Sequence, residues 1–214
     1  MIYFNTLPKV LTTDQSGNLI VLTNLLTRVK VLDSVRDNFL LFYEYDIQDG
    51  DTPEALAEKY YKDPYKYWII LHVNNLLDPL WNWPLPYGQF EDYLNEKYKD
   101  EAALAGKPVY EYVRTTIHGR EKIITTIDSE SKRENVEYIS VDETTYNGIT
   151  ESSVSYTLPD TGFTCTVNTT KRIVYLYDYE NELNESKRRI RVLNADYVGS
   201  FEDTFKGLMS NVRA

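Results

Sequence analysis

The sequence predicts an α+β fold: a small β-α-α unit with flanking helices, an antiparallel β-rich insertion and a C-terminal helix. Three observations lead to this prediction. An alternating, strand-like run precedes two proline-marked helix starts between residues 39 and 75. Short runs rich in Thr, Val, Ile and Tyr then fill residues 109–177. Apolar residues with helical spacing return after residue 195.

Residues 1–38 are predicted to form an N-terminal extended arm. Pro8 precedes the turn sequence "DQSGN", and the apolar run Leu19 to Leu22 follows it. Two interpretations remain open for this arm. It packs on a partner, or it folds back as a strand on its own domain.

A strand with one buried face is predicted from Phe39 to Ile47. The run begins apolar and then alternates, with Tyr43, Tyr45 and Ile47 on one side and acidic residues on the other. Gly50 follows at a position suited to a turn. This strand opens the helical core of the chain, predicted to span residues 39–107.

The first helix is predicted to start near Pro53 and to run to about Tyr61. Thr52 is a typical N-cap residue, and a proline at the first helical position loses no hydrogen bond. Leu56, Ala57 and Tyr60 make its apolar face. The helix therefore turns one side towards a core.

The second helix is predicted to begin at the pair Asp63-Pro64, with "YKYWIILHV" as its body. Four consecutive apolar residues from Trp68 to Leu71 leave almost no polar side, so this helix is expected to be buried, with Trp68 in the core. Asn74 and Asn75, which turn easily, end it.

The sequence "LLDPLWNWPLP" follows and predicts an apolar loop, because its three prolines forbid a long helix. Trp81 and Trp83 either close the small core or stand ready for a partner. As exposed indoles they would be the best candidates for interface anchors. The predicted contact surface also includes Asp78, Pro79, Asn74 and Asn75.

An amphipathic helix is predicted from Phe90 to Ala105, ending at Gly106-Lys107-Pro108. From residue 108 to 178 the sequence predicts antiparallel strands at "YEYVRTTI", "KIITTI", "VEYISV", "SVSYTL", "FTCTV" and "RIVYLY". The separators are His118-Gly119, "DSESKREN", Asn147-Gly148 and Asp160-Thr161-Gly162.

Residues 179–214 are predicted to hold a C-terminal strand and helix. Ile190 and Val192 alternate with arginines, which indicates a short strand. Asn194 or Asp196 can cap the final helix. The apolar face of that helix is predicted to consist of Val198, Phe201, Phe205 and Leu208.

The composition indicates protein partners. The chain has 214 residues, a formal net charge of −10 and a pI of about 4.8, so phosphate-rich partners such as nucleic acid or anionic membranes would be repelled. The 19 tyrosines suit surfaces that become buried against other proteins, although half-buried strands would also use them. No signal peptide or membrane span is predicted.

No common catalytic motif occurs in the sequence. We therefore predict no enzymatic activity, no bound cofactor and no metal site. Cys165 and His72 are interpreted as packing residues, and a disulfide framework is excluded by the single cysteine. A glycosidase with paired carboxylates remains an alternative, because acidic residues are frequent. The basic cluster of Lys187, Arg188, Arg189 and Arg191 is either a solvated strand face or an anchor for a carboxylate-rich neighbour.

The order strand, "DGDT", helix, helix, "NN" resembles a LysM module, a small β-α-α-β unit best known for binding N-acetylglucosamine polymers. The usual Gly-Gln-x-Leu-x-Ile-Pro ending is replaced by "LLDPLWNWPLP", which argues against a working glycan groove. The residues of the LysM-like motif are Tyr45, Gly50, Asp51, Thr52, Pro53, Leu56, Ala57, Tyr60, Trp68 and Asn74 or Asn75.

A longer pattern is more specific. The run from "YDIQDGDTPEALAEKYY" to "LLDPLWNWPL", followed downstream by "NELNESKRRIRVL" and "YVGSFEDTFKGLM", resembles the LysM-like baseplate wedge proteins of T-even-type contractile-tailed bacteriophages. The resemblance covers residues 39–85 and 181–209, and it is thin elsewhere.

This resemblance implies a structural, non-enzymatic protein of the virion tail baseplate, assembled in the host cytoplasm. Its partners would be other wedge proteins in a six-fold assembly, joined into a ring around the central hub. A LysM-type peptidoglycan-binding module is the alternative. Glycan binding is nevertheless not expected, because the usual LysM ending is replaced in this sequence.

Overall fold

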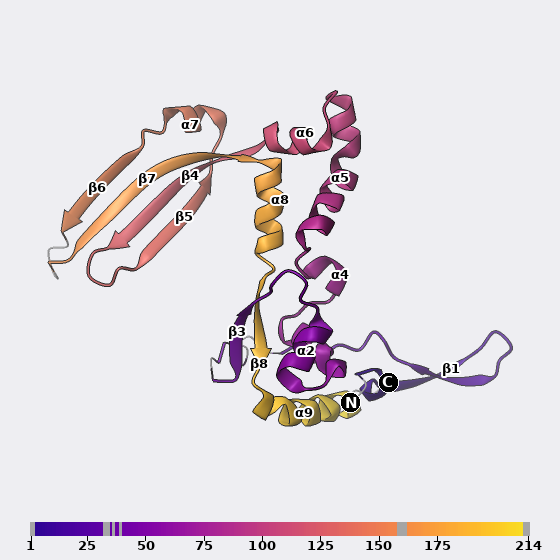
Figure 1. Cartoon of the computed structure of the whole chain (residues 1–214). Coiled ribbons are helices and arrows are strands. Elements are labelled where there is room, and N and C mark those ends of the chain that lie inside the picture. Colours follow the sequence, from indigo (N-terminus) through magenta and orange to yellow (C-terminus); the bar gives the residue numbers. More distant parts are fainter. Residues whose placement is uncertain (1–2, 32–34, 36, 39, 158–161, 212–214) are drawn as a thin grey trace. The chain divides into compact units, whose positions relative to one another are not determined.

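The computed structural model describes residues 3–31, 35, 37–38, 40–157 and 162–211 (Figure 1). They form an α+β protein with small antiparallel sheets and a C-terminal helix, as the sequence predicts. The chain divides into two compact units. Unit 1 comprises Met1–Tyr87 and Asn184–Ala214, and unit 2 comprises Gly88–Leu183. The division into four segments stays a prediction.

Unit 1 begins with a 3-10 helix, η1 (Tyr3–Thr6), and a hairpin of β1 (Lys9–Thr13) and β2 (Leu19–Thr23). The predicted turn joins the strands, where Asp14 Oδ1 accepts hydrogen bonds from the backbone N–H groups of Ser16 and Asn18, both 2.8 Å long. The arm therefore folds back on itself as a two-stranded ribbon.

The central ribbon of unit 1 pairs β3 (Phe42–Asp46) with β8 (Arg189–Leu193), antiparallel. The predicted start at Phe39 lies outside the described residues. Tyr43 is 52% exposed, so its expected place on a buried face is wrong. A two-stranded ribbon twists strongly. Phe42 and Ile47 are both buried, although side chains at these two positions point to opposite faces of an extended strand. The core therefore contacts one face at the start of β3 and the other face just after its end.

The predicted helix pair is confirmed. Helix α2 (Pro53–Tyr61) has Thr52 as N-cap, whose Oγ1 accepts from the N–H of Ala55 at 3.2 Å. The 3-10 helix η2 (Pro64–Lys66) leads into α3 (Tyr67–Val73).

Helix α3 is buried as expected, because Trp68, Ile69, Ile70 and Val73 are all less than 5% exposed. The following segment differs from the predicted loop, since it forms one helical turn, α4 (Pro79–Asn82). A turn this short is compatible with its prolines because Pro79 stands at the first helical position.

The C-terminal part of unit 1 contains η3 (Ala195–Tyr197), capped by Asn194, and α9 (Val198–Asn211). Leu208 is 48% exposed, which corrects its predicted place on the apolar face. At about 100° per residue, position 209 returns to within about 20° of Val198, whereas 208 is turned well away. Met209 is accordingly the buried residue.

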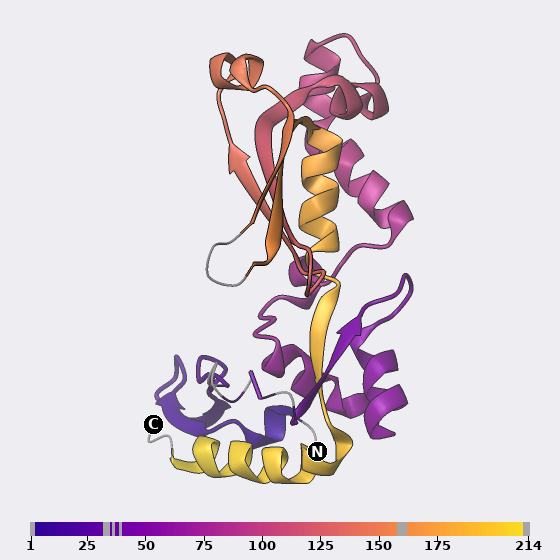
Figure 2. The same cartoon turned by 90° about the vertical axis from the view of Figure 1, so that its left-hand side faces the viewer.

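A single apolar core joins these elements. Figure 2 shows α9, in yellow, beside the indigo N-terminal segment, and the ring of Tyr3 lies 5.4 Å from Trp68 and 5.7 Å from Phe205. The buried residues of this core are Leu7, Phe42, Ile47, Leu56, Ala57, Tyr61, Trp68, Ile69, Ile70, Val73, Trp83, Ile190, Val192, Leu193, Val198, Phe205 and Met209.

Besides a short helix described below with the sheet, the helices of unit 2 are α5 (Tyr87–Leu104), α6 (Val109–Thr115) and α8 (Leu176–Glu185). The first residue of α5 and the last residues of α8 belong to unit 1. Helix α5 confirms the predicted amphipathic helix. The strand predicted at "YEYVRTTI" is wrong, because α6 occupies it. Packing of Val113 and an ion pair between Arg114 and Glu91 at 3.1 Å outweigh the β propensity of these residues.

The remaining predicted strands form one antiparallel sheet in the order β5-β4-β7-β6 (Figure 1). The strands are β4 (Ile117–Asp128), β5 (Glu134–Ser140), β6 (Ser152–Thr157) and β7 (Thr164–Tyr175). The predicted antiparallel arrangement is therefore confirmed.

Three details of the predicted strands are wrong. His118-Gly119 is a register shift within β4, not a separator. "TCTV" and "RIVY" belong to the single strand β7, which Phe163 precedes, and the last residues of "RIVYLY" start α8. Asn147-Gly148 ends a short helix, α7 (Glu143–Gly148). The turn residues Asp160 and Thr161 lie outside the described residues.

A buried carboxylate ties α8 to α5. Glu180 is 4% exposed and accepts hydrogen bonds from Lys97 (2.6 Å), Tyr98 (2.7 Å) and Tyr93 (3.2 Å). Burial by itself raises the pKa of Glu180, but these donors outweigh it and the net pKa lies below the usual value. The buried charge is therefore compensated, as a structural ion pair requires.

Truncating Trp68 to Ala should destabilise unit 1 by about 3–5 kcal/mol, because the indole is 4% exposed and its removal leaves a cavity. The three tryptophans of the chain all lie in unit 1, so urea unfolding followed by tryptophan fluorescence reports on this unit. The exposed Trp81→Ala is the control and should change the free energy of unfolding by less than about 1 kcal/mol. If both variants lost the same free energy of unfolding, the assignment of Trp68 to the core would be wrong.

Candidate protein-interaction site

Of the predicted contact residues, Asn74, Arg189 and Arg191 lie where β8 pairs within unit 1. Asn74 follows α3 and pairs with β8 through its side-chain amide. Its Nδ2 donates to the carbonyl of Arg191 (2.7 Å), and its Oδ1 accepts from the N–H of Arg191 (2.8 Å). Asn75 adopts a left-handed conformation with φ of 54°, which ends α3. Asn74 thus connects α3 to β8, and Asn75 ends α3, so both residues stabilise the fold of this chain.

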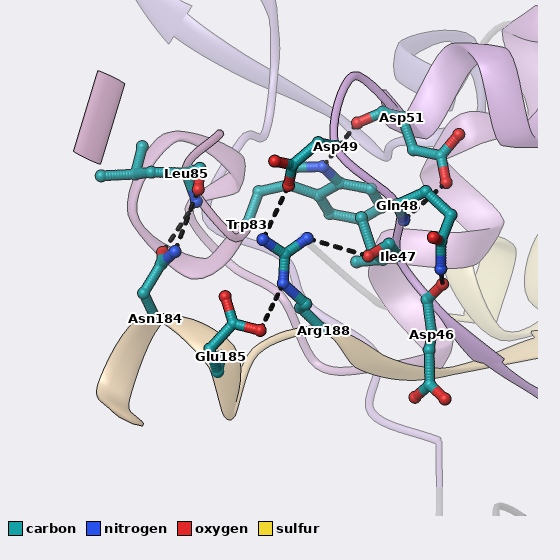
Figure 3. A network of polar contacts seen from close by, with 10 residues as sticks. All are labelled: Asp46, Ile47, Gln48, Asp49, Asp51, Trp83, Leu85, Asn184, Glu185 and Arg188. Atoms are coloured by element: carbon teal, nitrogen blue, oxygen red, sulfur yellow. Dashed lines mark hydrogen bonds and ion pairs between the residues drawn. The ribbon is translucent and has the colours of Figure 1, made fainter. Parts of the chain in front are cut away.

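A second asparagine makes the same kind of contact at the other end of the returning segment. Asn184 Oδ1 accepts from the N–H of Leu85 (2.8 Å), and its Nδ2 donates to the carbonyl of Leu85 (2.9 Å). Asn184 is only 5% exposed. Figure 3 shows this amide facing the Leu85 backbone. The two contacts fasten the segment 184–191 to residues far upstream.

Arg188 lies in the sequence between Asn184 and Arg191, the two residues of the returning segment that make these contacts, and it is the centre of the network in Figure 3. Its guanidinium donates to the carbonyl of Ile47 (3.0 Å), to Asp49 (2.7 Å) and to Glu185 (2.7 Å). The N–H of Ile47 donates in turn to the carbonyl of Arg188 at 2.9 Å. Arg188 therefore anchors the turn that follows β3.

The "DGDT" turn is also stabilised by hydrogen bonds to one of its own residues, Asp51. Asp51 Oδ2 accepts from the N–H of Gln48 (2.9 Å) and from the hydroxyl of Tyr45 (2.7 Å). Gly50 supplies the φ of 92° that the turn requires. These hydrogen bonds within the chain fix the shape of the turn.

Trp83 is the first of two tryptophans with opposite environments. It is 9% exposed, and its Nε1 donates to the carbonyl of Asp51 at 2.9 Å. Of the two interpretations offered by the sequence, closure of the core therefore describes Trp83. Its expected role as an exposed anchor does not fit this placement, because the indole is already buried within its own chain.

Trp81 is 63% exposed and lies on α4 beside the exposed Leu77 and Leu80. Asp78 caps this turn, accepting from the N–H of Leu80 at 3.0 Å. Pro79 starts it. A capped turn thus presents Leu80 and Trp81 to solvent, and the exposed Leu77 directly precedes the cap. Exposed apolar and aromatic side chains of this kind are typical of a protein contact.

The basic residues on β8 have acidic partners within the chain. Arg189 pairs with Glu44 across the ribbon, and Arg191 pairs with Asp37 at 2.7 Å. Lys187 is half-buried, and its N–H donates to the carbonyl of Asn184. Carboxylate partners for Arg189 and Arg191 are therefore present in unit 1 itself.

Two cavities of about 370 and 330 Å³ flank His72 in unit 1, of which the larger is mainly apolar and the smaller is mixed. The first is lined chiefly by the segment before β3 and by Phe201, Phe205 and Leu208 of α9. The second is lined by residues that include Phe4, Leu25 and Leu77. Burial lowers the pKa of the His72 imidazole, because desolvation disfavours its charged form.

The sequence did not reveal Asn184 or the cavities beside His72. Asn184 stands in a polar helical stretch, where nothing distinguishes it from its neighbours. The cavities form only when α9 and the N-terminal segment come together around α3. In the part of the chain that is described, no group of three or more His, Cys, Asp or Glu side chains could hold a metal ion. No described helix is long and apolar enough to cross a membrane.

Replacing Asn184 by Ala should lower the free energy of unfolding of unit 1 by about 2–3 kcal/mol, because the partly buried N–H and carbonyl of Leu85 lose their partners. Asn82→Ala, at an exposed asparagine of α4, is the matched control and should cost less than about 1 kcal/mol. Tryptophan fluorescence in urea measures both. Equal stabilities would contradict a clamp at Asn184.

Unit 1 should lose stability as the pH falls below about 6.5, the pKa of an unperturbed histidine. The folded pKa of His72 is lowered, so only the unfolded chain binds the proton in the window just below that value. The stabilisation is present above about pH 6.5 and declines by at most about 1.4 kcal/mol per pH unit through the window.

His72→Phe should remove this part of the pH dependence, measured as the difference in unfolding free energy between about pH 7.5 and about pH 5.5. His118→Gln, in unit 2, is the control and should leave the fluorescence-detected pH dependence unchanged. An unaltered pH profile in His72→Phe would contradict the assignment.

Comparison with known proteins supplies the family. A direct comparison with curated proteins found no match. The phage family model described as "Base plate wedge protein 53" matches residues 11–208, which covers unit 2 and nearly all of unit 1. The chain therefore belongs to the phage base plate wedge protein 53 family.

Proposed function

We propose that this protein joins wedge subunits into the ring around the central hub during assembly of a contractile phage tail. Membership of the wedge family supports a structural role in the base plate of the virion. The six-fold arrangement, the contractile tail and assembly in the host cytoplasm are parts of this proposal. The protein is proposed to act without catalysis.

The exposed apolar turn around Trp81 is the observation that carries the proposal. Leu77, Leu80 and Trp81 are each more than 60% exposed. Such a cluster is costly to leave in water, and large aromatic anchors dominate the energetics of protein interfaces. The capped helical turn keeps the indole in place before a partner arrives, which lowers the entropy cost of binding.

Co-expression with the neighbouring tail proteins of the same genome tests this function. The wild-type chain should co-elute with at least one of them in a stable complex on size-exclusion chromatography with mass determination. Trp81→Ala should leave unit 1 folded and weaken that complex at least about tenfold.

Tyr65→Ala is the matched control, because Tyr65 is 69% exposed and lies on η2, outside the apolar turn. It should leave co-elution unchanged. Normal assembly of Trp81→Ala would remove this turn from the interface. A wild-type chain that stays monomeric with every neighbouring tail protein would contradict the structural role itself.

A LysM-type glycan-binding module is the second candidate. The order β3, α2, α3 and β8, with β3 paired to β8, is a β-α-α-β arrangement and supports this alternative. Sedimentation with purified peptidoglycan, or binding of chitin oligomers, would favour it. No binding at millimolar ligand, the weak end of the affinity scale, would exclude it.

A further inference from the structure

The sheet of unit 2 extends beyond the core of that unit. Within the described residues, the buried apolar side chains of unit 2 are Phe90, Leu94, Tyr98, Ala102, Val113 and Val174. All lie on α5, on α6 or at the end of β7 that leads into α8. Every residue of β5 and β6 is exposed. The outer part of the sheet is therefore not covered by a layer of its own chain.

The two edges of this sheet differ in charge. Strand β5 carries Glu134 and Glu137, and a charged edge resists pairing with another strand. Strand β6, "SSVSYT", has no charged residue and no proline. It pairs with β7 on one side and has no strand on its other side among the described residues. Charge therefore protects β5 and leaves β6 open.

We propose that β6 pairs antiparallel with β6 of a second copy of this chain, joining two four-stranded sheets into one. Copies that each carry a net charge of −10 repel one another, so a contact between them is least costly at an uncharged surface. The β6 edge is such a surface. A two-fold contact of this kind closes on itself, as in most homodimers.

The strand is complementary to itself in one particular register. With the two-fold axis at Ser155, Val154 of each copy lies opposite Tyr156 of the other, and Ser153 lies opposite Thr157. Aromatic and β-branched residues are favourable cross-strand pairs, as are pairs of hydroxyl residues. Val154 and Tyr156 are 57% and 46% exposed, so they are available for this contact.

The new sheet would also continue an existing face. Within the chain, Val154 lies beside Val167 and Tyr156 lies beside Cys165 on β7. Ser153 and Ser155 bond to Asn168 (2.6 Å) and Thr166 (2.9 Å) on the other face. The added strand extends the apolar row on one face and the hydroxyl row on the other. So short a pairing predicts a weak dimer, with a Kd on the order of 10–100 µM.

Sedimentation velocity of the full chain tests the proposal between about 5 and about 500 µM. The wild-type chain should change from monomer to dimer across this range. Ser155→Lys places two like charges directly opposite each other at the axis and should raise the Kd at least about tenfold. Ser155→Glu should do the same. An equal mixture of the two variants should restore the dimer as a heterodimer.

Ser140→Lys is the matched control, since it makes the same change on the opposite edge strand, β5, and should leave the dimer intact. Circular dichroism should show the same folded signal for all variants, because Ser155 and Ser140 are exposed. A wild-type chain that remains monomeric at the highest concentration overturns the proposal. So does a dimer that Ser155→Lys leaves unchanged, or one that the mixed variants fail to restore.

Discussion

The pairing of β8 with β3 is the contact on which unit 1 depends. Residues 189–193 complete a ribbon whose other strand lies about 150 positions earlier, and between them the chain forms the whole of unit 2. Closing so long a connection has an entropy cost. The ribbon has only five residues in each strand, so its own hydrogen bonds offset little of that cost. Asn74, Asn184 and Arg188 add side-chain contacts to backbone groups at both ends of the returning segment. Because Ile190, Val192 and Leu193 also enter the core, hydrophobic burial and specific hydrogen bonds act together.

Helix caps and hydrophobic alternation in the sequence predicted the helices and strands whose formation depends on nearby residues. Thr52-Pro53 starts α2, and Asp63-Pro64 starts the 3-10 helix η2, which leads into α3. The alternation around Ile190 likewise gave β8, and the α+β class follows from such elements. Patterns of this kind are reliable because capping and period depend on a few neighbouring residues.

Other features depend on tertiary contacts and could not be predicted. The residues of α6 have the composition of a strand, yet Pro108 and the packing of Val113 place them in a helix. Trp81 and Trp83 are two residues apart in one apolar stretch, and only the position of the Asp51 carbonyl decides which indole is buried. The predicted charge anchor on β8 illustrates the same limit, because Glu44 and Asp37 are remote in sequence from the arginines that they meet.

The clamp between Asn184 and Leu85 has a consequence for the architecture of the chain. Two residues that are 99 positions apart are held within hydrogen-bond distance of each other. For unit 1, the long segment that leaves after Leu85 and returns at Asn184 is equivalent to a surface loop whose two ends already meet. The inserted unit can therefore be lengthened, shortened or exchanged without stretching the host fold. The fold of this chain thus separates a body closed on itself, unit 1, from an inserted unit 2.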